Sequence, residues 1–491
     1  MFDLFASLLI AQESAPLLVA QENRSKEELL PHQVPQPGED QGSSVGRSPA
    51  AIVTEPQEVR PLPGSLNEIP VFNSNSPEVI AQEGILLSTF PKAGKSQAIA
   101  HLETPLEGRF DIFTHHISRP ATEQRTLYQG LLVNNPTGSP RTLKILQGIS
   151  YLNSKDAPFR ELLPFVEDPQ GHVYSGPGSR LVSDTLRGKS QTQFPEILRI
   201  PPYSTVVLAN LPIPVSGARS TYLQVETDGS VYLANLAKYE VREEIATSSI
   251  SNNGSIVEGK AVRSRPPSLN EWRSLLTQGQ LVEPRDLPPV PSKDPGRIIY
   301  GRVAGISVGS QWEATVTDPD AESLAIPAPG EAISFPISTT STGTFGTDQV
   351  QSAPMLTRYP DTALQGHGNY LVHYKLTFPL ENTSDEYQWT SLTFQTPIKD
   401  DLHSDRLSFF ESPPNRVFYR GTVRINYPNE YRRQITRYVH LVQHRGQRSE
   451  PLATLEIPPG TSRTAEIDFF YPPDATPPQV ITVRTLAPEE R

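Results

Sequence analysis

The chain contains 491 residues, of which 43 are basic, 54 are acidic and 50 are proline, and it contains no cysteine. The missing cysteine excludes disulfides, thiolate metal sites and cysteine nucleophiles. The net charge of −11, without a basic stripe, argues against nucleic-acid binding. Because proline ends helices and is excluded from central strands, its abundance predicts many short strands joined by turns and extended connectors.

Residues 1–22 hold two short apolar runs, Leu4–Ala11 and Pro16–Ala20. Neither approaches the roughly 20 residues that span a bilayer, so we interpret the segment as a degenerate signal peptide cleaved after Ala11 or Ala20. Asp3 stands where a signal peptide carries positive charge, and an apolar peptide packed on the domain is the alternative. We therefore expect an exported protein, periplasmic, envelope-associated or extracellular, without a transmembrane span.

Residues 23–57 are rich in Pro, Gly, Ser, Gln and Glu, a composition typical of a disordered tail. From 58 to 250 the sequence alternates short apolar runs, such as Gly84–Phe90 and Arg109–Ile117, with turns built from Pro, Gly and Asn. This spacing predicts a first β domain of the β-sandwich type. The dipeptide Asp228-Gly229, between two alternating runs, predicts a two-residue hairpin.

Residues 251–295 are predicted to hold a helix and a Pro-rich linker between two domains. Ser268 and Glu271 have the spacing of a capping box, Trp272 lies on an apolar face, and Gly279 can end the helix. The helix is expected to pack on the first domain or between the two.

Residues 296–487 form the predicted second β domain. Period-2 alternation of side chains, clearest from Tyr370 to Lys375, is typical of half-buried strands. The whole sequence therefore predicts a mainly β fold: two β-sandwich-like domains joined by a short helix and a Pro-rich linker, with a disordered N-terminal tail.

Two stretches resemble catalytic or phosphate-binding motifs but lack their context. Gly305–Gly309 matches the G-x-S-x-G nucleophile elbow around Ser307, which needs a helix after the serine. The alternating, β-branched residues that follow predict a second strand instead. Gly94-Lys95-Ser96 resembles the end of a P-loop, but Thr89 stands where that loop needs a glycine. We therefore assign no catalytic residue.

The histidine pairs and the acidic loop do not have the spacing of metal ligands. His115 and His116 are neighbours in a predicted strand and face opposite sides of it, whereas His440 and His444 would lie about 13 Å apart along a strand. The acidic stretch Asp318–Glu322 lacks the glycine and the final glutamate of an EF-hand loop. We predict no metal site and no cofactor, with calcium at this acidic loop as the open alternative.

One polar loop is a candidate binding or structural element. Its residues have the short polar side chains of Asx- and Ser-type turns, which bond nearby backbone groups: Asn73, Ser74, Asn75, Ser76 and Glu78. The loop either braces the start of the first domain or contacts a ligand.

Aromatic residues of the second half are a weaker indication of a sugar-binding face. Aromatic side chains in strands more often belong to a core, and we favour that interpretation. The residues concerned are Tyr359, Tyr370, Tyr374, Trp389, Phe418 and Tyr419.

Seven stretches carry a family resemblance: Ile69–Glu78, Glu83–Pro91, Gly108–Asp111, Ile299–Gly305, Ser352–Leu356, His367–Tyr370 and Phe418–Val423. Together they resemble a cyanobacterial family of uncharacterised proteins, domain of unknown function 3370, over roughly residues 58–487. The resemblance implies a cyanobacterial source and an envelope or secreted location. It implies no catalytic residues.

Three functional hypotheses follow. The first is a non-enzymatic, exported envelope protein with a structural or binding role, whose partners are envelope glycans or envelope proteins. The second is a carbohydrate-active protein, a glycan binder or a hydrolase, acting on wall material or exopolysaccharide. The third is a secreted subunit that assembles through exposed edge strands.

Overall fold

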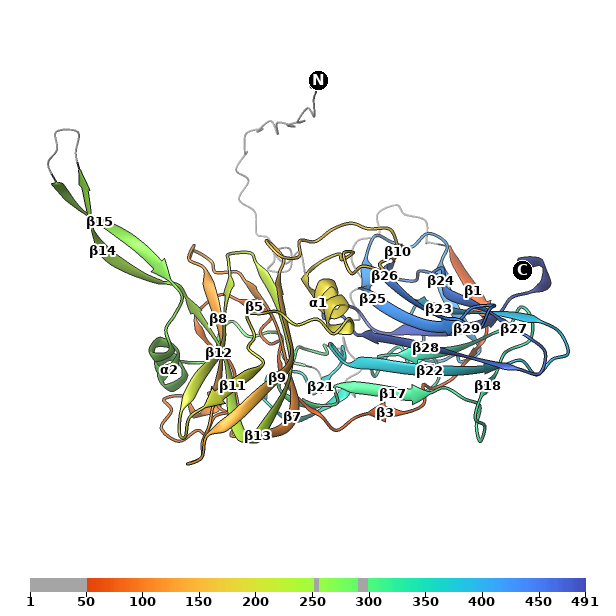
Figure 1. Cartoon of the computed structure of the whole chain (residues 1–491), viewed down its shortest axis with the longest axis horizontal. Coiled ribbons are helices and arrows are strands. Elements are labelled where there is room, and N and C mark those ends of the chain that lie inside the picture. Colours follow the sequence, from red (N-terminus) through yellow and green to blue (C-terminus); the bar gives the residue numbers. More distant parts are fainter. Residues whose placement is uncertain (1–50, 251–255, 290–298) are drawn as a thin grey trace, which may run out of the picture.

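A computed structural model describes residues 51–250, 256–289 and 299–491 (Figure 1). The predicted signal segment, most of the predicted tail and much of the Pro-rich linker lie outside these ranges. Within them strands predominate and two segments are α-helical, so the prediction of a mainly β fold is confirmed.

The first half of the described chain contains, in order, β1 (Ile52–Pro56), β2 (Glu58–Val59), β3 (Ser65–Leu66), β4 (Pro70–Ser74), β5 (Val79–Ile80), β6 (Gly84–Ser88), a 3-10 turn (Ala98–Ala100), β7 (Leu106–Ser118), β8 (Leu127–Asn134), β9 (Arg141–Leu152), β10 (Phe165–Glu167), α1 (Pro177–Leu186), β11 (Ile197–Ile200), β12 (Thr205–Ile213), β13 (Ala218–Tyr239), β14 (Val241–Ile250), β15 (Ile256–Arg265) and α2 (Leu269–Gln278).

The second half contains β16 (Ala304–Val308), β17 (Gln311–Thr315), β18 (Leu324–Ala325), β19 (Ala332–Ile337), β20 (Ala353–Arg358), β21 (Gln365–Gly366), β22 (His373–Glu381), β23 (Gln388–Gln395), β24 (Arg406–Phe410), β25 (Val417–Pro428), β26 (Gln434–His444), β27 (Pro451–Ile457), β28 (Ser462–Phe470), β29 (Gln479–Thr485) and a 3-10 turn (Pro488–Glu490).

The strands form two β units that lie side by side (Figure 1). In the N-terminal unit, a sheet of order β11-β9-β13-β7-β4 faces a layer that contains β6, β8 and β12. Apolar side chains of both layers meet between them, among them Phe110 on β7 and Leu131 on β8. In the C-terminal unit, a sheet of order β27-β23-β29-β19-β2 faces the sheet β26-β25-β28-β22-β17, with Phe335 and Leu376 in the shared core. Each unit is thus two sheets around one core.

The two units share one strand order. The five-stranded run β11-β9-β13-β7-β4 corresponds to β27-β23-β29-β19-β2. In both runs the fifth strand is parallel to the fourth, and the other neighbours are antiparallel. The facing layers correspond as well, because β8 pairs with β12 as β22 pairs with β28. The chain therefore contains two versions of one topology.

A buried asparagine closes the same turn in each unit. After β8, Oδ1 of Asn135 accepts hydrogen bonds from the backbone N–H (2.9 Å) and hydroxyl (2.8 Å) of Thr137, while its Nδ2 donates to the carbonyl four residues further on and to that of the last residue of β11. After β22, Asn382 makes the corresponding bonds with Ser384 (3.0 and 2.7 Å), with the carbonyl four residues further on and with the last residue of β27.

Several strands cross from one half of the sequence to the other unit. β2, β3 and β10 pair with strands of the C-terminal unit, and β16 extends the N-terminal sheet by pairing with β4. β20 and β21 follow at the edge of the same sheet. The predicted domain boundaries, 58–250 and 296–487, stay a prediction, and each half of the sequence supplies strands to both units.

Helix α1 lies between the two units (Figure 1). Leu181 and Val182 of this helix share an apolar cluster with Phe113 and Tyr222 of the N-terminal unit and with Phe470 of the C-terminal unit. This helix was not predicted from the sequence. The signal for it is Pro177 at the first helical position, where the missing N–H has no cost.

Helix α2 is the predicted one. The side chain of Ser268 accepts from the N–H of Glu271, the carboxylate of Glu271 accepts in return, and Gly279 follows the last turn. Trp272 is buried against the N-terminal unit, so the helix packs there and not between the units. No helix among the described residues is long and apolar enough to cross a membrane.

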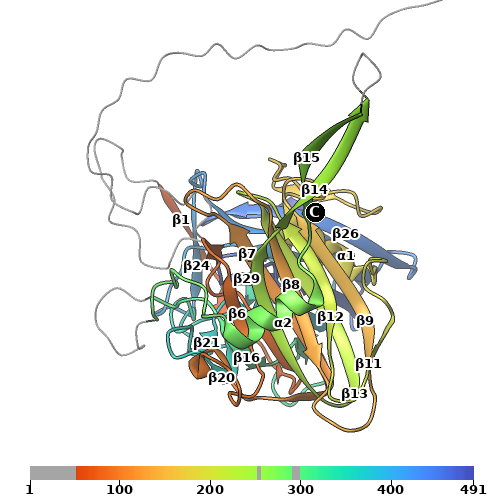
Figure 2. The same ribbon diagram turned by 90° about the vertical axis from the view of Figure 1, so that its left-hand side faces the viewer.

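Strands β14 and β15 form a hairpin that projects from the body (Figure 2). Among the described residues they pair only with each other. Arg265 at the base of the hairpin contacts Glu243 (2.6 Å) and Glu271 (2.8 Å), which connects the hairpin to α2. Val262 remains 64% exposed.

The predicted hairpin at Asp228-Gly229 is wrong. Both flanking runs belong to the single strand β13, which pairs with β7 in the same direction on either side of an irregularity between Thr227 and Val231. The carboxylate of Asp228 accepts from the backbone N–H of Thr142 on β9 (2.9 Å), so the dipeptide bulges against a neighbouring strand and does not reverse the chain. β13 can thereby pair with β9 before the bulge and with β8 after it.

We expect Asn135→Ala and Asn382→Ala to destabilise the protein by similar amounts. Each substitution leaves several buried backbone and hydroxyl groups without partners, at about 1–3 kcal/mol each, so a loss of about 3 kcal/mol in the free energy of unfolding is expected. Urea denaturation measures it. Asn270→Ala, on the exposed side of α2, is the control and should change stability by no more than about 0.5 kcal/mol. A large loss in one turn with none in the other would contradict the correspondence.

Candidate functional site

The predicted polar loop connects β4 to β5 at the junction of the two units. The whole set is buried, with an exposed fraction of 8% or less: Asn73, Ser74, Asn75, Ser76 and Glu78. β4 is held on both sides, by β7 in parallel and by β16 antiparallel. The loop is therefore held in place by strands from both halves of the sequence.

The expected Asx- and Ser-type turns are not formed. Within the described chain, Oδ1 of Asn73, Oδ1 of Asn75 and Oγ of Ser76 have no hydrogen-bond partner. Ser74 contacts other side chains, His116 (3.2 Å) and Asn235 (2.9 Å). The reason is that the backbone here is already paired with β7 and β16, so few backbone N–H groups remain for side chains. Whether the loop contacts a ligand or braces the fold stays a prediction.

A buried ion pair joins this loop to the chain that follows the linker. Oε2 of Glu78 lies 2.6 Å from Nη2 of Arg302, and Asp286 lies 3.7 Å from the same guanidinium. Burial disfavours the charged guanidinium, but the carboxylates of Glu78 and Asp286 outweigh this effect and raise the pKa of Arg302. His115 lies 3.6 Å from the other oxygen of Glu78.

A pocket lies beside this ion pair, and we call it the junction pocket. Its lining comes from five separate parts of the chain, around Asn75, Arg302, Thr340, His367 and Thr476, and its volume is about 80 Å³. The ring of Tyr300 forms part of the wall and contacts the ring of His367, with centroids 4.7 Å apart. At about 30 Å³ for each water, the pocket has room for a few waters or for the end of a larger ligand.

Unpartnered polar atoms distinguish this pocket. Four of its lining residues have a buried side-chain atom without a hydrogen-bond partner in the described chain: Oδ1 of Asn73, Oδ1 of Asn75, Nδ1 of His367 and Oγ1 of Thr476. An unpartnered buried polar group costs about 1–3 kcal/mol. Buried polar groups in proteins are nearly always paired, so the four atoms around this cavity call for a partner from outside the described chain, such as an ordered water, an ion or a ligand.

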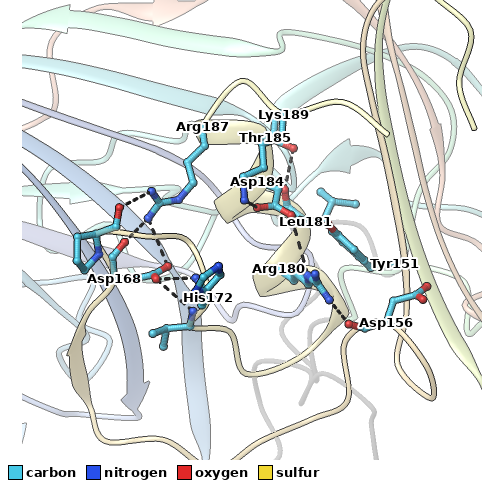
Figure 3. Close-up of polar contacts among 12 residues, drawn as sticks. Tyr151, Asp156, Asp168, His172, Arg180, Leu181, Asp184, Thr185, Arg187 and Lys189 are labelled. Atoms are coloured by element: carbon cyan, nitrogen blue, oxygen red, sulfur yellow. Dashed lines mark hydrogen bonds and ion pairs between the residues drawn. The ribbon is translucent and has the colours of Figure 1, made fainter. Parts of the chain in front are cut away.

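A second polar cluster, around α1, has a structural explanation (Figure 3). The carboxylate of Asp168 accepts from the backbone N–H of His172 (2.8 Å) and lies 3.3 Å from Arg187, and that of Asp184 lies 2.6 Å from Lys189. These carboxylates have cationic or N–H partners at short range. They fasten the loop before α1 to the helix and hold the helix between the units.

His115 and His116, which are adjacent in β7, lie on opposite faces of that strand, as expected. Nδ1 of His115 lies 2.8 Å from Oγ of Ser220, and Nδ1 of His116 lies 2.9 Å from the carbonyl oxygen of Pro77. Burial lowers the pKa of His115 to about 4 and that of His116 to about 3. Both side chains are therefore neutral at neutral pH.

The two stretches that resemble a nucleophile elbow and a P-loop form a strand and a turn. Ser307 lies within strand β16, and β17 follows, so the predicted succession of two strands is confirmed. The turn between them includes Gly309, whose φ of 109° is unfavourable for other residues, and it carries the chain from the N-terminal sheet to the C-terminal one. Gly94-Lys95-Ser96 forms a turn before the 3-10 turn Ala98–Ala100.

The described residues contain no group of three His, Asp or Glu side chains placed to hold a metal ion. Asp318, in the acidic stretch, lies 2.6 Å from Arg60 and accepts from the backbone N–H of Ala325. His440 contacts the hydroxyls of Ser175 (3.0 Å) and Thr422 (3.2 Å). These side chains stabilise turns and the core.

Most of the aromatic residues considered for a sugar-binding face belong to the core. Buried side chains are those of Tyr359, Tyr374, Phe418 and Tyr419, with Trp389 half-buried. Tyr370 is also half-buried, and it differs from the others because it lines the junction pocket.

Of the residues that line the junction pocket, the loop residues Asn73, Asn75 and Glu78 were site candidates from the sequence. Arg302, His367 and Thr476 were not candidates. A signal was present, because three stretches noted for the family resemblance, Ile69–Glu78, Ile299–Gly305 and His367–Tyr370, all contribute to the lining.

We expect Asn75→Leu to leave the free energy of unfolding unchanged or to raise it by about 1 kcal/mol, because it removes an unpartnered buried amide. A bracing role predicts the opposite, a loss of about 1–3 kcal/mol. Urea denaturation distinguishes the two. Asn382→Leu is the matched comparison, since Asn382 is also buried but bonded at both amide atoms, and it should be clearly destabilising.

The low pKa of His116 predicts a pH dependence of stability. An unfolded histidine titrates near pH 6.5, so below that pH the unfolded chain binds a proton that the folded one does not, until about pH 3. The free energy of unfolding should then fall with decreasing pH by about 1.4 kcal/mol per unit for each such histidine. In His116→Gln the slope between pH 6 and 4.5 should be shallower by about this amount. An unchanged slope would show that His116 is protonated in the folded state.

Two solved structures are remotely similar to this chain. The Paenibacillus xanthan lyase is 8% identical with a TM-score of 0.14, over 91% of this chain and 27% of the lyase. Lac15 from a marine microbial metagenome is 10% identical with a TM-score of 0.09, over 75% of this chain and 51% of Lac15. The chain thus spans about a quarter of the first protein and half of the second, and these TM-scores support no inference.

No curated protein matches the chain. A family model does match, over residues 57–485, which include both β units, the loop 73–78 and every residue of the junction pocket. The chain therefore belongs to the family described as "Protein of unknown function (DUF3370)".

Proposed function

We propose that this protein is an exported, non-enzymatic protein of the cell envelope that binds a ligand in the junction pocket. One observation carries the proposal: Asn73 and Asn75 both line this pocket, and the amide oxygen of each is buried without a hydrogen-bond partner in the described chain. Such groups add nothing to a scaffold, because burying them costs stability unless a bound molecule or an ordered water pairs with them.

Export and location rest on the sequence. The apolar run Leu4–Ala11 has the length of a signal-peptide core. The stretches that resemble the uncharacterised family support a cyanobacterial source and a periplasmic, envelope-associated or extracellular location. Envelope glycans and envelope proteins are the partners to which such a location gives access.

Binding is better supported than hydrolysis. Among the described residues that line the junction pocket, Glu78 is the one carboxylate, and Arg302 neutralises it at 2.6 Å. Glycoside hydrolysis in its usual form needs two carboxylates that flank the bond, separated by about 5 to 9.5 Å. A glycan-binding role, one form of the carbohydrate-active alternative, remains compatible with the amides and with the Tyr300 ring.

The projecting hairpin supports a second candidate, assembly through edge strands. The outer edges of β14 and β15 have no strand beside them in the described chain, and Val262 is exposed. Such an edge can pair with another chain. The charged pairs across the hairpin, including Lys260 with Glu244 (2.8 Å), oppose that pairing by keeping the surface polar.

Cell fractionation with sequencing of the mature N-terminus tests the location, and retention on peptidoglycan and native exopolysaccharide tests the binding. We expect the protein outside the cytoplasm with a start after Ala11 or Ala20. We also expect retention that falls at least tenfold in Asn75→Leu and is unchanged in Asn270→Ala. Recovery of the intact Met1 form from cytoplasm would contradict export. Retention that is as strong in Asn75→Leu as in the natural protein would contradict binding in the junction pocket.

A further inference from the structure

We propose that the junction pocket takes the end of a neutral, hydroxyl-rich ligand, such as a terminal sugar residue, which hydrogen-bonds to the amides of Asn73 and Asn75. This inference rests on the proposed binding function and specifies the chemistry of its ligand. It follows from the charge of the pocket, the type of its free polar groups, and its walls.

The charge of the pocket favours a neutral ligand. The carboxylate of Glu78 is offset by the guanidinium of Arg302 at 2.6 Å. Burial lowers the pKa of His367 to about 4, so its ring is uncharged at neutral pH. An anion would face Glu78 and a cation would face Arg302, and either would leave a charge uncompensated in a buried place.

The free polar groups favour hydroxyls. Oδ1 of Asn73 and Oδ1 of Asn75 need donors, and each amide also carries an NH₂ group that can donate. A hydroxyl group donates and accepts, so it can meet either end of an amide and either tautomer of the His367 ring. A carboxylate or phosphate without protons offers acceptors only and would leave both amide oxygens unpartnered.

The walls and the size of the pocket favour the end of a sugar. Tyr300 is held by a hydrogen bond between its hydroxyl and that of Thr342 (2.6 Å), which leaves its ring as an apolar wall opposite the polar groups. Gly368 allows the backbone to lie close to the ring of Tyr370, because a Cβ at this position would lie 2.5 Å from that ring. A volume of about 80 Å³ is too small for a whole oligosaccharide, so the rest of a longer ligand must lie outside.

Calorimetry and saturation-transfer NMR on the full chain test the inference at pH 7. The neutral probes are glucose, galactose, mannose and N-acetylglucosamine, and the charged probes of similar shape are glucuronate and glucosamine. We expect at least one neutral sugar to bind, and the charged analogues to bind at least tenfold more weakly. In Asn75→Leu the affinity for that sugar should fall at least tenfold, whereas Asn270→Ala should keep the affinity of the natural protein.

Three results would overturn the inference: no neutral sugar bound at 100 mM, charged probes bound as tightly as neutral ones, or full affinity in Asn75→Leu. The outcome is separable from that of the proposed function. Retention on envelope polysaccharide that depends on Asn75 but is not competed by any of these sugars leaves the binding function standing and removes the neutral sugar end as its ligand.

Discussion

The ion pair between Glu78 and Arg302 is the constraint on which the junction depends. Two opposite charges buried together need each other, because removal of either one leaves the other without water or a partner, at about 3–5 kcal/mol. Glu78 follows β4 and Arg302 precedes β16, so the pair fixes the point at which the chain returns to the N-terminal sheet after the linker. It also makes the neighbouring pocket electrically neutral. The same ion pair thus stabilises the fold at the junction and determines the charge of the pocket.

The repeated topology separates buried asparagines that hold the fold together from buried asparagines that do not. Asn135 and Asn382 occupy the same turn in the two units and use both ends of their amides to hold it. Asn73 and Asn75 are nearly as buried, yet their oxygens bond to nothing in the described chain. The described chain therefore contains buried asparagines of two kinds: those bonded at both ends of the amide, and Asn73 and Asn75, whose oxygens lack a partner and which both line the junction pocket. This contrast supports a binding role for the junction pocket more than its volume does.

The parts of the fold that depend on local chemistry could be predicted from the sequence. The capping box of Ser268 and Glu271 is such a case, and so is the strand after Ser307, which excluded a nucleophile elbow. Asp228-Gly229 misled because the same dipeptide suits a tight turn and a bulge, and only the strands beside it decide between them. Helix α1 was missed because its apolar residues are short of a full helical stripe and gain their burial from two units at once.

The site could be predicted only in part, for a related reason. The loop 73–78 is polar and compact enough to be noticed alone. Its counterparts, Arg302, His367 and Thr476, are ordinary surface-type residues in sequence and become a pocket only when crossing strands bring their segments together. Neither the hydrophobic periodicity nor the spacing of residues in the sequence predicts that these segments lie together. Three of the seven stretches of family resemblance contribute to its lining and would have indicated it better.

The crossing strands also determine how the molecule would carry mechanical load. Residue 51 leads into β1, β2 and β3, which pair with β24, β19 and β17 of the C-terminal half. Tension applied through the N-terminal segment therefore enters the unit built mainly from the far end of the sequence. The N-terminal unit is reached only after those three strands have been pulled away. An anchor at the start of this chain would thus transmit force first to the C-terminal unit. The N-terminal unit, although nearer to the anchor in sequence, would be loaded last.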